Sequence, residues 1–151
     1  MLARILAVIT LLFAVQAAAT EQYYSHKTRG AAKGADVVAY FGLEPGAPAV
    51  MGSETITYEW GGATWRFANN ENRQKFIDNP EKYVPQFGGY CAFAVAKGFT
   101  APPRPDSWTI VEDKLYLNNN PVSHKIWLGK LDAQIEKGLS NWPSALNKPS
   151  L

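Results

Sequence analysis

The amino-acid sequence predicts an α+β fold in which hairpins form a small antiparallel sheet, short helices pack on it, and a longer C-terminal helix follows. Two patterns carry this prediction. Polar and apolar residues alternate on both sides of residues 61–62, as in half-buried strands joined by a tight turn, and residues 108–111 and 115–117 form a second hairpin pattern around a Glu-Asp turn. Over residues 121–139, apolar residues instead recur mostly every four positions, as on one face of a helix.

The first hairpin is predicted around a Gly-Gly pair. Ile56, Tyr58 and Trp60 alternate with polar residues, which is the period of a strand with one buried face. Gly61-Gly62 then supplies two residues that adopt positive φ without steric cost, as a two-residue hairpin turn requires. Residues 64–67 are mostly β-branched or aromatic, and this composition favours a return strand.

Two short helices are predicted after this hairpin. Asn69 or Asn70 can cap the first helix, whose apolar side is Phe76-Ile77. Pro80 begins the second helix, because the N–H that proline lacks has no helical partner at the first position of a helix. The hairpin and these helices form a unit whose apolar face needs the rest of the chain to cover it.

The remaining elements follow from local signals. Before the first hairpin we expect a short buried strand or turn over residues 34–41 and a Pro/Gly loop over 42–52. After the two short helices we expect a helix over 89–97 ended by Gly98 and a rigid extended run over 101–106. A second hairpin, with strands 108–111 and 115–117 around a turn at 112–113, and a helix over 121–138 complete the chain.

The central unit resembles a known family. Residues 58–83, YEWGGATWRFANNENRQKFIDNPEKY, resemble the YHS domain, a small module found in some copper-transporting ATPases, some phenol hydroxylases and many bacterial exported proteins. Residues 88–98, GGYCAFAVAKG, are similar to the continuation in the exported branch of that family. The likeness extends over about residues 36–142, with its core motif in 36–93, and implies a single YHS-type domain over residues 20–151.

Residues 1–19 have the pattern of a secretory signal peptide. Arg4 is their one charged residue, residues 5–15 form an apolar run, and Ala17-Ala18-Ala19 fits a small-residue cleavage site. The sequence therefore predicts cleavage near Ala19 and a periplasmic or secreted protein. No second apolar run is long enough to cross a bilayer, so we expect no membrane span after cleavage.

Charge and motifs narrow the function classes. The chain has 15 Lys and Arg against 13 Asp and Glu, a formal charge of +2, and no basic cluster, so nucleic acid is not an expected partner. It also lacks a phosphate loop, a Ser-centred nucleophile elbow, an H-E-x-x-H motif and a nucleotide fingerprint. An enzyme is accordingly the weaker expectation.

The resemblance implies that the protein binds a metal ion, most of all copper, through cysteine thiolates. The family pattern has one Cys near the first strand and a Cys-x-x-x-Cys after the hairpin. On this sequence the three positions are Ala39, Ala68 and Asn72, so none of the thiols is present. Because a structural zinc site needs four such ligands, we do not expect one.

Cys91, His26 and His124 remain as candidate metal ligands. A copper(I) ion prefers soft thiolate and binds imidazole, so a site built from these three residues is one hypothesis. Cys91 is the only cysteine, which excludes an intramolecular disulfide, and a lone Cys with apolar neighbours is most often a small buried side chain. A second hypothesis makes Cys91 a redox-active or catalytic thiol, which requires a base beside it.

A metal-independent binding module is the alternative to metal handling. The chain is rich in large aromatic rings, and a subset of them can line a pocket for a small apolar or aromatic ligand or a partner. The expected pocket residues are Trp65, Arg66, Tyr90, Cys91 and Phe93. Taken together, the sequence predicts an exported, non-enzymatic YHS-type binding or accessory protein, with copper handling and metal-independent ligand binding both left open.

Overall fold

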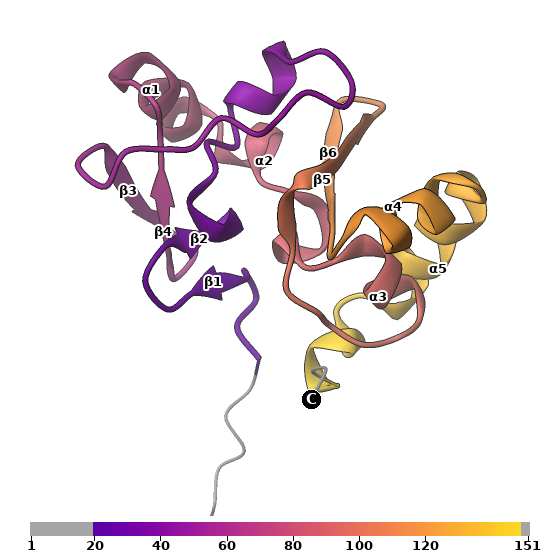
Figure 1. Cartoon of the computed structure of the whole chain (residues 1–151). Helices are drawn as coiled ribbons and strands as arrows, with labels where there is room; N and C mark the ends of the chain where they lie inside the picture. The colour runs from indigo at the N-terminus through magenta and orange to yellow at the C-terminus, as the bar shows by residue number, and fades with distance from the viewer. Residues whose placement is uncertain (1–19, 149–151) are drawn as a thin grey trace, which may run out of the picture.

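Three antiparallel hairpins and several short helices make up the computed structural model, which describes residues 20–148 (Figure 1). The predicted signal peptide, residues 1–19, lies outside the described residues. The hairpins pair β1 (Ser25–His26) with β2 (Gly30–Ala31), β3 (Thr57–Trp60) with β4 (Ala63–Arg66), and β5 (Arg104–Val111) with β6 (Lys114–Asn118). The α+β prediction is confirmed, with the hairpins as three separate two-stranded sheets.

The helical elements are short. The α-helices are α1 (Asn70–Asp78), α2 (Pro80–Tyr83), α3 (Ala92–Ala96), α4 (Pro121–Leu128) and α5 (Leu131–Asn141), and the 3-10 turns are η1 (Ala32–Gly34), η2 (Ala39–Gly42), η3 (Gln86–Gly89) and η4 (Ser144–Asn147). None of the helices within residues 20–148 has the length and apolar character needed to cross a membrane.

Both predicted hairpins form as the turn residues require. Gly61 and Gly62 have φ of 60° and 77°, and the second hairpin turns at Glu112 and Asp113 with φ of 49° and 58°. Both turns therefore have two consecutive left-handed residues, which matches the twist of the flanking strands. The second hairpin begins earlier than predicted, because the end of the expected extended run, from Arg104 onward, already belongs to β5.

The predicted single C-terminal helix is wrong, because the chain breaks at residues 129–130 into α4 and α5. Lys130 leaves the helical region with φ −140° and ψ 46°. The predicted apolar face contained Val122 and Ile126, yet these side chains are 68% and 50% exposed, whereas Trp127 is fully buried. The break lets α4 bury Trp127 while α5 packs against α3 in a different direction.

The helix predicted over residues 89–97 is also shorter than expected. Gly88 and Gly89 have φ of 61° and 79°, and Tyr90 is extended, so the helix α3 begins only at Ala92. The end of α3 agrees with the prediction, because Gly98 has φ 92° and stops the helix. The segment over residues 34–41, predicted as a buried strand or turn, forms a turn around Asp36 and continues into η2.

Strand β6 lies between two hydrophobic cores and is buried on both faces. Leu115 and Leu117 belong to a first core with the hairpin β3–β4 and α1, whereas Tyr116 between them belongs to a second core with α3, α4 and α5. Alternate residues of a strand point to opposite faces, so one strand serves both cores. Figure 1 shows the β5–β6 hairpin between these two halves, with its turn near η2 at one end of the molecule.

Candidate ligand-binding site

The three candidate metal ligands are not brought together. Cys91 is 1% exposed, and its Sγ lies 3.7 Å from Asn118 Oδ1 in the interior. His26 Nδ1 accepts from the backbone N–H groups of Thr28 and Arg29, both at 3.3 Å, in the β1–β2 turn. Within residues 20–148 no group of three or more His, Cys, Asp or Glu side chains lies close enough to hold a metal ion.

The environment of Cys91 is that of an inert interior thiol. Burial raises the pKa of Cys91, and this outweighs the opposite effect of nearby N–H and hydroxyl donors, including the backbone N–H of Ala94. The thiolate is the nucleophilic and metal-binding form, so a raised pKa and near-complete burial both disfavour reaction at neutral pH. This geometry gives the catalytic and copper hypotheses for Cys91 no support.

The predicted pocket residues fall into different parts of the structure. Trp65 packs in the first core, with its ring 5.1 Å from that of Phe76, whereas Tyr90 and Phe93 pack in or against the second core. Arg66 donates to the carbonyl of Thr28 at 2.7 Å. These residues serve packing within the two halves, and the hollows described below are lined by others.

The three positions at which the resemblance places cysteines do lie together, around a buried carboxylate. Asp36 is fully buried; its Oδ1 accepts from the backbone N–H of Val38 (2.9 Å) and Ala39 (3.1 Å). Its Oδ2 accepts from the backbone N–H of Ala68 and the side-chain amide of Asn72, both at 2.8 Å. Four donors match the capacity of one carboxylate, so Asp36 ties η2 to β4 and α1 and has no oxygen left for a cation.

An apolar groove beside this turn is the strongest candidate for a binding site. It has a volume of about 490 Å³ and is lined by Tyr40, Phe41, Leu43, Pro45, Gly46, Trp108, Thr109, Ile110, His124 and Leu128. These residues come from η2 and the loop after it, from β5 and from α4, so the groove lies where the two halves of the molecule meet. Its volume is within the range of about 300–1,000 Å³ that is typical of small-molecule pockets.

Two buried aromatic rings form the floor of the apolar groove. Tyr40 and Trp108 have ring centroids 5.2 Å apart and are 0% and 5% exposed. Their polar atoms are used elsewhere: the Tyr40 hydroxyl donates to the carbonyl of Pro105, and Trp108 Nε1 donates to the carbonyl of Ala47, both at 2.8 Å. These hydrogen bonds fix the orientation of both rings beneath the groove.

His124 supplies the imidazole of the groove. Its Nε2 lies 2.6 Å from Thr109 Oγ1, and that hydroxyl donates to the carbonyl of Trp108 at 2.8 Å. Because the only hydroxyl hydrogen is used on the carbonyl, Thr109 must accept from His124, which places the proton of the neutral imidazole on Nε2. Burial lowers the pKa of His124 from its ordinary value of 6.5.

The lowered pKa of His124 predicts a pH dependence of stability. At a pH above its ordinary pKa, His124 is neutral in the folded and the unfolded protein, so its titration does not change the free energy of unfolding. At a pH below that value, the unfolded protein binds the proton more readily than the folded protein, so stability falls. Lowering the pH from about 7.5 to about 5 should therefore destabilise the wild type more than His124→Asn, which has no such group. Urea unfolding across this range measures the difference; a pH-independent gap between the two proteins would contradict it.

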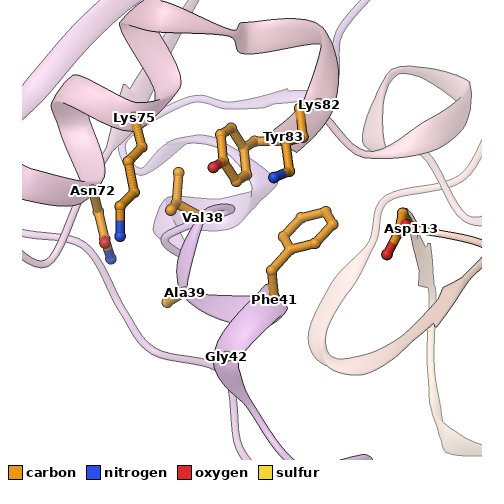
Figure 2. A pocket seen from close by; sticks show the side chains of 9 residues that line it. All are labelled: Val38, Ala39, Phe41, Gly42, Asn72, Lys75, Lys82, Tyr83 and Asp113. Carbon is orange, nitrogen blue, oxygen red and sulfur yellow. The ribbon is translucent and has the colours of Figure 1, made fainter.

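A second hollow, the polar cleft, adjoins the groove through Phe41. It has a volume of about 670 Å³ and is lined by Val38, Ala39, Phe41, Gly42, Asn72, Lys75, Lys82, Tyr83 and Asp113. Figure 2 shows Tyr83 between Lys75 and Lys82, and Phe41 on the side toward Asp113, which comes from the β5–β6 turn. The rings of Phe41 and Tyr83 meet edge to face, with centroids 5.3 Å apart.

The charges of the polar cleft largely offset one another. Lys75 Nζ pairs with Glu71 Oε1 at 2.8 Å, and Lys82 Nζ lies 5.3 Å from the centre of the Tyr83 ring. Glu71, which lies outside the lining, pairs with Lys75, and Asp113 adds a negative charge on the far wall, so the charges of the cleft largely offset one another. The apolar groove, whose walls have one clear chemical character, is therefore the better-defined site.

Comparison with known proteins assigns no relative: no family model, no curated protein and no solved structure matches this chain.

Proposed function

We propose that this protein is an exported, non-enzymatic binding protein of the YHS type that holds a small apolar or aromatic molecule in the apolar groove without a metal ion. The observation that carries the proposal is the groove itself, a hollow of about 490 Å³ on a floor of two hydrogen-bonded aromatic rings. The pattern of residues 1–19 supports export, and the similarity of residues 58–83 to the YHS domain supports the family assignment.

The chemistry of the groove indicates the kind of ligand. The half-buried side chains of Phe41, Leu43 and Ile110 form its walls, and the exposed Leu128 forms part of its rim. A ligand of this size gains binding free energy from burying apolar surface, about 25 cal/mol per Å². The neutral imidazole of His124 is the polar point within reach, so one hydrogen-bonding group on an otherwise apolar molecule fits this site.

We propose binding without a metal ion because the candidate metal-ligand positions are engaged in other contacts. The carboxylate of Asp36 accepts hydrogen bonds where the resemblance places cysteines, and Cys91 is enclosed in the interior. The apolar groove offers a binding surface that needs no metal ligand. This favours the metal-independent interpretation over copper handling.

A neutral fluorescent dye, N-phenylnaphthylamine, tests the proposal directly. It should bind the wild type with one saturable site, and Leu128→Glu should weaken binding at least about tenfold, because a carboxylate at the rim must be desolvated when the dye enters. Leu128 is 42% exposed, so the substitution leaves the cores intact.

Ile126→Glu is the matched control for the dye experiment. Ile126 lies on the same helix, is 50% exposed and does not line the groove, so this variant has the same charge change at a different face. Its affinity should equal that of the wild type. Equal weakening in both variants, or no saturable binding to the wild type, would overturn the proposal.

A further inference from the structure

A basic hollow on another part of the surface gathers three cationic side chains. The basic hollow has a volume of about 610 Å³. Arg29 comes from the β1–β2 turn, Lys33 from η1, and Arg104 from the start of β5, and all three line it. Because Arg104 is far from the other two in the sequence, only the fold brings these charges together.

The cations of the basic hollow have no paired carboxylate. The salt bridges among residues 20–148 join Arg66 to Glu54 and Lys75 to Glu71, and neither involves the hollow. Asp106 is the one carboxylate among its lining residues, and its Oδ1 accepts from the backbone N–H of Ala49 at 2.9 Å. Three positive charges against one negative leave an excess of two positive charges in the hollow.

The positive charges of the basic hollow act on one another. Burial lowers the pKa of Lys33, and the nearby positive charges of Arg29 and Arg104 lower it further, so the three groups repel one another. Lys33 also has φ 52° and follows Ala32 at φ 48°, a left-handed backbone that costs free energy in residues other than glycine. A bound anion would offset the repulsion.

We propose that the basic hollow binds the phosphate group of a small molecule or free phosphate. Two guanidinium groups present planar pairs of N–H donors that match phosphate oxygens, and an ammonium adds a third charge. The ligand is therefore a small anion with more than one negative charge, and the site is separate from the apolar groove in residues and chemistry.

Titration with inorganic phosphate tests this proposal. At constant ionic strength, with sodium chloride replaced by phosphate, the wild type should show saturable binding by calorimetry and a rise in Tm that chloride does not produce. Arg104→Gln and Lys33→Asn should each weaken phosphate binding at least about tenfold. Asn is chosen at residue 33 because it tolerates the left-handed backbone.

Two controls separate this site from general charge effects and from the groove. Lys137→Gln on α5 removes one positive charge outside the hollow, and Leu128→Glu alters the groove; both should keep wild-type phosphate affinity. In phosphate-free buffer of low ionic strength, Arg104→Gln should be at least as stable as the wild type, because one repulsive charge is gone. A stability loss there with unchanged phosphate affinity would overturn the proposal, as would equal weakening in Lys137→Gln.

The source of the phosphate group is resolved by a second titration with glycerol phosphate. Binding of glycerol phosphate at least as tight as that of inorganic phosphate supports a phosphate monoester as the ligand. Binding of inorganic phosphate alone supports the free ion. Failure of both anions to bind more tightly than chloride contradicts the site.

Discussion

Replacing Asp36 with alanine should destabilise the protein by about 4 kcal/mol or more, the largest effect expected of any single substitution outside the aromatic core. The carboxylate is fully buried and accepts from the backbone N–H groups of Val38, Ala39 and Ala68 and from the amide of Asn72. Alanine would leave these donors without partners, and each unpaired buried donor costs about 1–3 kcal/mol before relaxation.

Two further variants make this prediction measurable even if Asp36→Ala does not fold. Asp36→Asn keeps the shape and one acceptor oxygen, but its amide faces donors, so we expect a loss of about 2–3 kcal/mol in urea unfolding. Asp78→Ala removes an exposed carboxylate that accepts from Gln74 at 2.8 Å and should change stability by less than about 0.5 kcal/mol. Equal stability of Asp36→Asn and the wild type would refute the proposed role of this carboxylate.

Gly138→Ala should destabilise the protein by about 2 kcal/mol, although alanine is the better helix former. A Cβ at Gly138 would lie 2.5 Å from Cζ and 2.9 Å from Cε2 of the Phe87 ring. Phe87 is 5% exposed and packs against Tyr116 and Trp142, with ring centroids 5.8 and 6.0 Å away, so it has little room to move. The side chain of Asn141 holds α5 to α3 through the carbonyl of Val95 at 2.9 Å.

Gly129→Ala is the matched control for this steric effect. Gly129 has φ −64°, and a Cβ there would meet nothing closer than 3.5 Å, so the same substitution should be neutral or stabilise by up to about 1 kcal/mol. In a Phe87→Leu background, which removes the ring, Gly138→Ala should cost much less than in the wild type. A cost that is the same in both backgrounds would show that Phe87 is not the obstacle.

Sequence patterns correctly predicted the turns and helix caps, because these depend on residues that are neighbours in the chain. The Gly61-Gly62 turn forms as expected, and so does the cap at Asn69, whose side chain accepts from the backbone N–H of Asn72 at 2.8 Å. The predictions were wrong where tertiary packing decides the bounds of a helix. The four-residue spacing that includes Val122 and Ile126 suggested one long helix, but the large buried side chain of α4 is Trp127, and the helix ends at Leu128.

The candidate site was harder to predict because its residues are distant in the sequence. The groove combines Tyr40-Phe41, Trp108 and His124, and no local spacing relates these positions. Cys91 is the single thiol of the chain, and whether a lone Cys is buried or accessible depends on the fold. The one local hint was Tyr40-Phe41 directly before the Pro/Gly loop, where large rings adjoin a segment rich in turn residues.

NMR titration with N-phenylnaphthylamine tests whether the apolar groove binds a small apolar molecule. The chain has five tryptophans, and their indole N–H signals report on different places in the fold. Binding in the apolar groove should give saturable shifts of the Trp108 indole and the His124 ring, with the signals of Trp60 and Trp65 unchanged. Shifts centred on Trp65, Tyr90 and Phe93, or no saturable shift at all, would contradict it.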